Sequence, residues 1–289
     1  MKTVLKNMAC ILWVATLLIG CQPNTKQTEE APVEKKDVYI QLYSVRDDIG
    51  KDFYQTIKDV AAIGYTGVEA AGYSEGKFYN LSPSEFTKAI EETGMKVLSS
   101  HTGKPLAEKV AETNWQETWT WWDECIKAHK EAGIKYLVMP WMPTPKTIAD
   151  LNVYCNYLNQ IGEKCNEAGI RFGYHNHSFE FKKVEDELMY DYLLANTDPS
   201  KVFFQMDVYW TVRGGHSPVE YFKANPSRFE LLHFKDHKEL GESGMVGFDA
   251  ILNSINLAGT KYIIVEVEKY NHTPLESVKI SYDYVQSIL

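Results

Sequence analysis

The chain has 289 residues, of which 44% are hydrophobic, and its formal net charge is −9. This length and composition are typical of one large globular domain. The acidic balance argues against nucleic acid as a partner, because phosphate backbones are bound by clusters of Lys and Arg.

The first 21 residues are typical of a secretory signal. Lys2 and Lys6 precede an apolar run over 8–19, and Gly20 and Cys21 follow it. The stretch LIGC (18–21) resembles the bacterial lipoprotein box, in which the cysteine is lipidated and becomes the new N-terminus. An ordinary signal peptide or a short anchor helix is the alternative, although the run is short for a membrane span. We expect lipidation at Cys21 and a place on the periplasmic side of a bacterial membrane, held by the lipid anchor alone.

Residues 22–37 are polar, contain two prolines and show no apolar periodicity, so we expect a flexible tether. Outside the cytoplasm the later cysteines would meet oxidising conditions. Cys155 and Cys165 lie far apart along one helical pattern, which predicts that they do not pair. We interpret Cys125, Cys155 and Cys165 as buried apolar residues.

From residue 38 onward one unit recurs, in which a helical stretch ends in Gly and a short apolar strand follows. Examples are EAGIKYLVM and EAGIRFGYH, with Gly at the expected end of the helix. The predicted strands are 38–45, 66–71, 96–101, 135–140, 171–177, 202–209, 229–235 and 261–268. The predicted helices are 52–63, 83–93, 116–132, 147–168, 186–196, 218–224, 248–258 and 274–288.

Eight alternating units in about 250 residues predict an α/β fold, a (β/α)8 TIM barrel that forms a single domain over 38–289. A doubly wound open sheet is the alternative. That fold should carry a Gly-rich phosphate loop after an early strand, and the sequence shows none.

Alternate residues of a barrel strand point inward, and the chemistry lies at the carboxyl ends of the strands. In the fifth predicted strand, Phe172 and Tyr174 mark the outer face, which leaves His175 and His177 inward. The same alternation turns further polar residues inward near the ends of other strands. They are Glu69, Ser99, His101, Gln205, Asp207, His233, Lys235, Glu266 and Glu268.

Burying so many polar groups is costly unless they bind one another or a cation. Glu, Asp and His in a mostly oxygen donor set favour Mn²⁺, Mg²⁺, Co²⁺ or Zn²⁺ over thiolate chemistry. The pattern therefore predicts either a metal site or a mutually hydrogen-bonded polar pocket.

Four stretches fall in the order and spacing of a known superfamily. They are GYHNHSFEF (173–181), FFQMDVYW (203–210), LLHFKDH (231–237) and YIIVEVEKY (262–270). Through them residues 38–289 resemble the sugar phosphate isomerase/epimerase superfamily, the xylose-isomerase-like barrels that include tagatose epimerases and inosose dehydratases.

This resemblance implies a divalent metal held by Glu, Asp, His and Glu from the last four strands. Carried over by position, these are Glu180, Asp207, His233 and Glu266. Mn²⁺ is the first choice of metal, with Mg²⁺, Co²⁺ and Zn²⁺ as alternatives. Many relatives carry the first glutamate on the fifth strand itself, where this chain has His175. Glu180 follows just beyond that strand, and His177 is the alternative ligand.

The resemblance also implies that the metal binds a sugar carbonyl and a neighbouring hydroxyl. We assign Glu180 and Glu266 as the catalytic pair, one removing the proton next to the carbonyl and the other returning a proton. Return to the opposite face gives epimerisation, return to the adjacent carbon gives isomerisation, and loss of a β substituent gives elimination. The predicted substrate contacts are Glu69, His101, His175, His177, Trp210 and Lys235.

The sequence thus predicts a metal-dependent isomerase or epimerase acting on a small carbohydrate. A non-phosphorylated sugar is favoured, because no Gly-rich phosphate turn is visible. A lyase or dehydratase acting on a keto-sugar or keto-glycoside, and a non-catalytic sugar-binding lipoprotein, are the alternatives. An abasic-site endonuclease is disfavoured by the net charge. The tryptophans within 115–122 sit at helical spacing and could pack on the barrel or on a second subunit, so a homo-oligomer stays open.

Overall fold

The structure is a computed structural model that describes residues 36–289. The predicted signal, the lipidation site Cys21 and residues 22–35 of the predicted tether lie outside the described residues. None of the helices within 36–289 combines the length and the apolar character that a membrane span requires.

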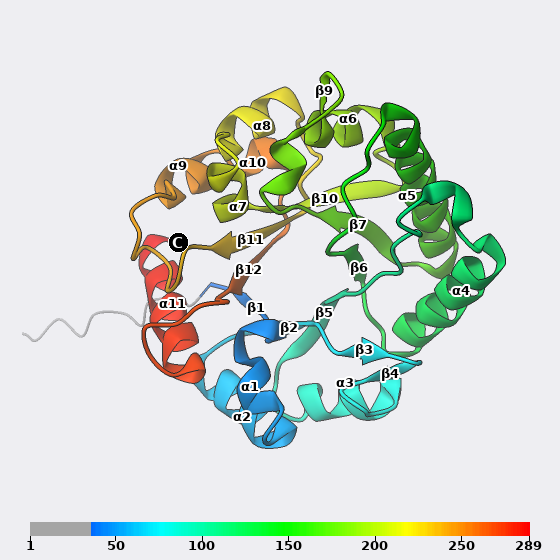
Figure 1. Ribbon diagram of the computed structural model, residues 1–289. Coiled ribbons are helices and arrows are strands. Elements are labelled where there is room, and N and C mark those ends of the chain that lie inside the picture. The colour runs from blue at the N-terminus through cyan, green and yellow to red at the C-terminus, as the bar shows by residue number, and fades with distance from the viewer. Residues whose placement is uncertain (1–35) are drawn as a thin grey trace, which may run out of the picture. The chain divides into compact units, whose positions relative to one another are not determined.

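Eight parallel strands close into a barrel in the order β1-β12-β11-β10-β7-β6-β5-β2 (Figure 1). Their bounds are β1 Tyr39–Gln41, β2 Gly67–Ala70, β5 Lys96–His101, β6 Tyr136–Met139, β7 Arg171–His175, β10 Val202–Asp207, β11 Leu231–Lys235 and β12 Tyr262–Glu266. Each of them lies within one of the eight predicted strands. The predicted (β/α)8 barrel and its single domain are confirmed.

Helices surround the barrel on all sides (Figure 1). They are α2 Phe53–Ile63, α3 Pro83–Glu91, α4 Trp115–Glu131, α5 Ile148–Ala168, α6 Met189–Asn196, α8 Pro218–Ala224, α9 Phe248–Asn253, α10 Ile255–Ala258 and α11 Pro274–Ile288. Side-chain caps fix several starts: Ser82 and Glu85 form a capping box on α3, and Thr147 caps α5. Gly169 ends α5 in the left-handed region, at φ 79°, as the Gly-ended pattern predicts.

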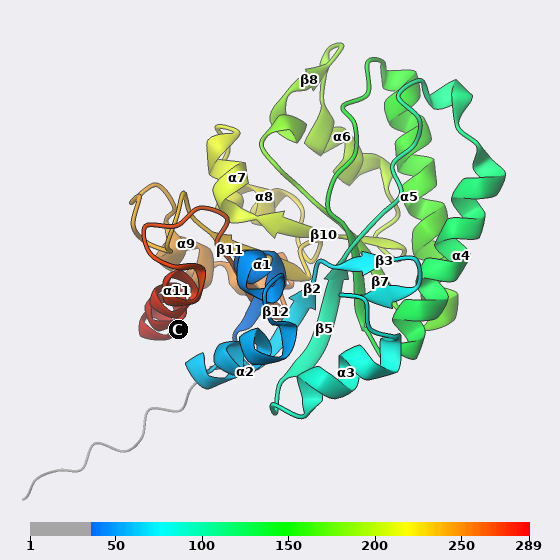
Figure 2. The same cartoon turned by 60° about the horizontal axis from the view of Figure 1, so that its bottom comes forward.

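The loops contain elements that periodicity did not predict. They are η1 Leu42–Val45, α1 Arg46–Ile49, the hairpin β3 Tyr73–Ser74 with β4 Lys77–Phe78, η2 Val110–Glu112, η3 Phe179–Phe181, the hairpin β8 Lys183–Val184 with β9 Glu187–Leu188, and α7 Val208–Arg213. Figure 2 shows the β8–β9 hairpin extending beyond α6.

Most of the predicted strands were too long, including 171–177, which ends at His175, and 261–268, which ends at Glu266. In two others, side chains at their ends turn the chain into helices. Gln41 accepts a hydrogen bond from the backbone N–H of Tyr43 and starts η1, where the prediction had a strand to residue 45. Asp207 does the same for Trp210 and starts α7, where the prediction had a strand to residue 209. Apolar content alone does not show such caps.

The amino-terminal end of the barrel is closed by a layer of apolar side chains, which we call the floor. It consists of Tyr39, Leu98, Tyr136, Val138, Phe203, Leu231 and Ile264, with Tyr262 packed against them. Edge-to-face contacts link the rings of Tyr39, Tyr262, Tyr136 and Phe203 in sequence. Gly173 makes room for this layer, since a Cβ there would lie 2.5 Å from the Phe203 ring.

A second and larger core fills the space between the strands and the helices. Cys125, Cys155 and Cys165 are buried and form no disulfide within residues 36–289, which confirms their interpretation as apolar core residues.

Candidate functional site

Four buried side chains meet above the floor, one from each of four neighbouring strands. His175 ends β7, Asp207 ends β10, His233 lies in β11 and Glu266 ends β12. Each offers one ligand atom, and these atoms all lie within 4.8 Å of one another. We call these residues the four-residue group. The alternation that turns Asp207, His233 and Glu266 inward is visible in the sequence.

Asp207 is the strongest indication of a cation. Its Oδ1 caps α7 by accepting a hydrogen bond from Trp210 N at 2.8 Å. Its Oδ2 is buried and has no hydrogen-bond partner among the described residues. Burial raises the pKa of Asp207 to about 8, with the Glu266 charge adding to the effect and Lys235 opposing it. A buried carboxylate oxygen that lacks a partner is costly unless an ion or a proton satisfies it.

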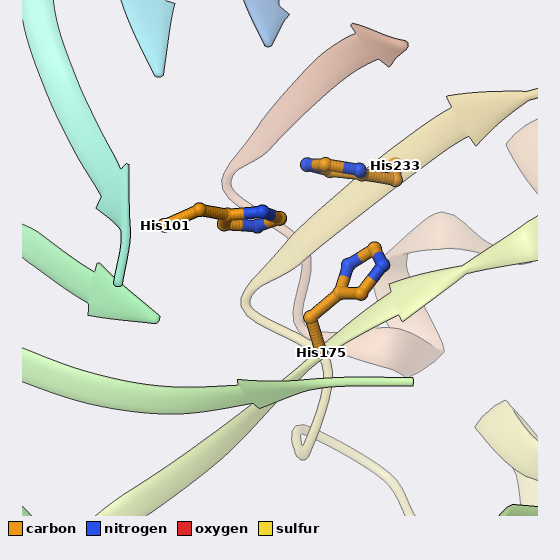
Figure 3. A group of neighbouring side chains, drawn as sticks. All are labelled: His101, His175 and His233. Atoms are coloured by element: carbon orange, nitrogen blue, oxygen red, sulfur yellow. The ribbon is translucent and has the colours of Figure 1, made fainter. Parts of the chain in front are cut away.

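Three imidazole rings converge in the same place (Figure 3). The His101 and His233 rings are stacked with centroids 5.0 Å apart, and the His175 ring meets both edge-on at 4.9 and 4.7 Å. Each of the three offers a ligand atom within 4.8 Å of the other two. The sequence predicted that His175 contacts substrate, whereas the structure brings it into the four-residue group.

Glu69, from β2, is fully buried among hydrogen-bond donors. Its Oε1 accepts from Gln41 Nε2 at 2.8 Å, and its Oε2 accepts from Ser99 Oγ at 2.6 Å and Gln205 Nε2 at 2.8 Å. His233 Nε2 lies 2.6 Å from Oε1. Burial raises the pKa of Glu69, but His101 and His233 outweigh it and lower the value to about 2.

Lys235, from β11, is buried beside two carboxylates. Its Nζ lies 3.7 Å from Glu266 Oε2 and 3.2 Å from Glu268 Oε2, and 5.8 Å from the centroid of the Trp210 ring. Burial lowers the pKa of Lys235, but Glu266 and Glu268 outweigh it and raise the value. Burial raises the pKa of Glu266, but Lys235 and His233 outweigh it and hold the value below the ordinary range. Lys235 and Glu266 therefore form an ionised pair.

Glu180 lies in η3, away from the four-residue group. Its Oε1 accepts a hydrogen bond from Tyr174 Oη at 2.7 Å, and its Oε2 accepts one from His177 N at 2.8 Å. Tyr174 faces the helices, so these bonds hold the Glu180 carboxylate on the outer side of β7. Burial raises the pKa of Glu180 to about 7. The assignment of Glu180 as a metal ligand and catalytic base stays a prediction, and the geometry does not favour it.

His177 lies just beyond β7 and stacks on Phe179, with ring centroids 5.9 Å apart. Its Nδ1 is buried and lacks a hydrogen-bond partner within 36–289. Burial lowers the pKa of His177 to about 4, so the ring is neutral near pH 7. Its centroid lies 5.8 Å from that of Trp210, another predicted substrate contact.

Asn176 has a part in the site that sequence reasoning missed. Asn176 Oδ1 accepts hydrogen bonds from Asp207 N and Tyr190 Oη, both at 3.2 Å. The hydrogen bond from Asp207 N ties the end of β7 to the end of β10 and so fixes the backbone of Asp207. An Asn between two histidines is the signal that the sequence carried.

The donor set fits a divalent cation. Two imidazoles and two carboxylates suit Zn²⁺, Co²⁺ or Fe²⁺, and they suit Mg²⁺ less well because that ion prefers oxygen ligands. The unpartnered Oδ2 of Asp207 gives the site an unused negative donor.

Comparisons with known proteins identify relatives of this chain. A protein named inosose dehydratase from Geobacillus kaustophilus (strain HTA426) is 25% identical over 213 residues, covering 66% of each chain. One of the same name from Lacticaseibacillus casei is 28% identical over 267 residues, covering 77% of this chain and 85% of that one. The chain thus spans just under two thirds of the first relative's length.

A solved structure of a sugar phosphate isomerase/epimerase from Parabacteroides distasonis ATCC 8503 is 34% identical. The match covers 86% of this chain and 97% of that one, with a TM-score of 0.80. A family model described as xylose isomerase-like TIM barrel matches residues 57–288. Because that match takes in most of the chain, this protein belongs to the xylose isomerase-like TIM barrel family.

Proposed function

We propose that this protein is a divalent-metal-dependent lyase that removes water from a keto-sugar or a related polyhydroxy ketone. The observation that carries the proposal is the four-residue group, in which Asp207 Oδ2 is buried and has no hydrogen-bond partner in the part of the chain that the structure describes. The names of the inosose dehydratase relatives support the same class of reaction.

When bound, a divalent cation would supply Lewis-acid polarisation of the substrate carbonyl. In our proposal His175, Asp207, His233 and Glu266 hold it. This set replaces the sequence-based one by exchanging Glu180 for His175. With two nitrogen donors, Zn²⁺ or Co²⁺ becomes the expected metal in place of Mn²⁺.

Glu266 is our choice for the base. Its carboxylate stays ionised beside Lys235 and His233, so it can accept the proton from the carbon next to the carbonyl. The bond from the adjacent carbon to its hydroxyl then breaks, and the proton on Glu266 passes to the departing oxygen, which leaves as water. Lys235 keeps Glu266 in place and can donate a hydrogen bond to the substrate.

The position of Glu180 favours elimination over epimerisation. Epimerisation needs an acid–base group on each side of the reacting carbon, and the sequence assigned Glu180 to the second side. Tyr174 and the backbone of His177 hold that carboxylate outside the four-residue group. An elimination in which one carboxylate takes and returns the proton needs no second carboxylate.

Isomerisation or epimerisation is the second candidate. It is supported by the 34% identity to the sugar phosphate isomerase/epimerase. The neutral His177, with its unpartnered Nδ1, could then act as the second proton-transfer group.

The test is to load the metal-free protein with Co²⁺ or Zn²⁺ and to incubate it with inososes, keto-sugars and keto-glycosides in deuterated water. We expect loss of water from one of these substrates. Deuterium exchange next to the carbonyl without loss of water would instead favour epimerisation. Neither reaction with any substrate would overturn the proposal.

Glu266→Gln tests the base, and Glu268→Gln is its matched control. Both carboxylates contact Lys235, but Glu268 lies outside the four-residue group. We expect Glu266→Gln to lower kcat by roughly 10²–10⁴-fold, the usual contribution of a positioned base. Glu268→Gln should change kcat far less. Equal effects of the two variants would remove Glu266 from this role.

A further inference from the structure

We infer that Glu69 is a positioning residue, which fixes the nitrogen that each of His233 and His175 presents to the metal. This inference rests on the metal site of the proposed function. The sequence predicted that Glu69 contacts substrate, but the structure leaves that carboxylate with no exposed surface.

Glu69 contacts His233 directly, and this contact is the first of two routes by which it fixes a histidine tautomer. Gln41 Nε2, Gln205 Nε2 and Ser99 Oγ donate to the Glu69 oxygens, so this carboxylate acts as an acceptor. His233 Nε2, at 2.6 Å, must then carry the hydrogen. Because a histidine that binds a metal is a neutral imidazole, Nδ1 then carries the free lone pair in the metal-bound protein. Nδ1 lies 3.4 Å from Glu266 Oε2, within the four-residue group.

The second route runs through Gln205. Because its Nε2 donates to Glu69 Oε2, the Gln205 amide is held with Oε1 toward the histidines. His175 Nδ1 lies 3.1 Å from that oxygen and donates to it. The free lone pair of His175 is then on Nε2, which lies 4.0 Å from Asp207 Oδ2.

One carboxylate therefore determines which ring nitrogen carries the hydrogen in two candidate ligands, His233 and His175, which come from different strands. A carboxylate behind a metal-binding histidine fixes the tautomer and the ring orientation, and it makes the ligand more basic. Glu69 acts on His233 by a direct hydrogen bond and on His175 through the side-chain amide of Gln205. Of the other groups around Glu69, Ser99 and Gln41 donate to it without touching either ring of the pair, and His101 Nε2 lies 3.0 Å from Oε1.

The experiment measures Co²⁺ affinity by competition with a chelator and records the visible spectrum of the Co²⁺-loaded protein. We expect Glu69→Gln to weaken Co²⁺ binding by roughly 10–100-fold and to shift the absorption bands. The amide would bring an N–H group among donors, so Nε2 of His233 would lose its fixed hydrogen-bond acceptor. Gln205→Leu removes only the second route and should have a smaller effect in the same direction.

Ser99→Ala is the matched control, because it removes a hydrogen bond to the same buried carboxylate and contacts neither His175 nor His233. It should leave the affinity and the spectrum unchanged. If the wild-type protein binds no Co²⁺, the proposed function fails. If the wild type binds and the folded Glu69→Gln and Gln205→Leu proteins match Ser99→Ala, the positioning inference fails alone.

A measurement on the unaltered chain keeps the test independent of how well Glu69→Gln folds. Long-range ¹H–¹⁵N correlation spectra of ¹⁵N-histidine-labelled, Zn²⁺-loaded protein report which ring nitrogen carries the hydrogen. We expect the hydrogen on Nε2 of His233 and on Nδ1 of His175. The opposite tautomer at either residue would overturn the inference.

Discussion

At the scale of single residues, Asp207 is both a helix cap and a candidate metal ligand. One oxygen starts α7 as a helix cap, and the other is free for a cation. The cap explains why the carboxylate cannot rotate away from the group, and its burial explains why it holds a proton in the metal-free protein. Helix capping and the proposed metal binding therefore use different atoms of one side chain.

This arrangement predicts a pH-dependent cost of folding. The pKa of Asp207 is raised from 3.8 to about 8 in the folded metal-free protein, so its contribution to stability is present below pH 3.8 and is lost as the pH rises through 8. Asn at this position keeps the cap and does not ionise. Metal-free Asp207→Asn should therefore gain stability over metal-free wild type as the pH rises, by on the order of 1–4 kcal/mol at pH 8.

Urea unfolding in the presence of a chelator, at pH 5 and pH 8, measures this difference. Adding Co²⁺ should stabilise the wild type and have little effect on Asp207→Asn, because the variant lacks the negative donor. A difference between the two proteins that is the same at both pH values would contradict the argument.

At the scale of elements, the end of β7 decides which residue joins the four-residue group. The strand ends at His175, and η3 follows within a few residues. Glu180 closes this turn by accepting hydrogen bonds from Tyr174 and from the backbone of His177. The turn thus directs a carboxylate that is near in sequence toward the outer layer.

Glu180→Gln distinguishes His175, the metal ligand that the geometry favours, from Glu180, the ligand that the sequence suggested. Because Gln can still accept the His177 N–H, we expect the variant to fold and to bind Co²⁺ as the wild type does. His175→Ala should weaken binding by more than the roughly 10–100-fold that outer partners of a metal ligand cost. A titration of Co²⁺ into both variants measures this, and a large loss in Glu180→Gln alone would restore Glu180 as the ligand.

How far the sequence predicts the structure also depends on the element. Gly-ended helices and apolar strands were enough to predict the barrel, and strict alternation turned Asp207, His233 and Glu266 to one face. Alternation has no meaning beyond the end of a strand. The direction of Glu180 depends on η3 and on a bond to Tyr174, and neither is visible as a periodicity. The inward side of His175 was predicted, but its place beside Asp207 follows from the stagger between strands.

At the scale of the whole molecule, the described residues form a barrel whose interior is apolar at the amino-terminal end of the strands and polar above it. The sequence before residue 36 resembles a lipoprotein signal, and we propose that Cys21 is lipidated and anchors the barrel to a membrane. This proposal is independent of the metal site, since no residue of the four-residue group is involved.

Cys21→Ser tests the anchor. In a bacterial host that processes lipoproteins, we expect the wild-type protein in the membrane fraction and labelled by an alkyne fatty acid. The variant should lose the label and leave the membrane fraction, while the Co²⁺ affinity of the purified protein stays the same. Labelling that persists in the variant would contradict lipidation at Cys21.

The floor of the barrel has a consequence for how substrate reaches the site and product leaves it. Linked aromatic rings from β1, β12, β6 and β10 fill the axis at the amino-terminal end. We therefore expect substrate, product and displaced water to enter and leave at the opposite end of the barrel. An inhibitor that is bound there should block entry and exit together, so we expect it to trap product as well as to exclude substrate.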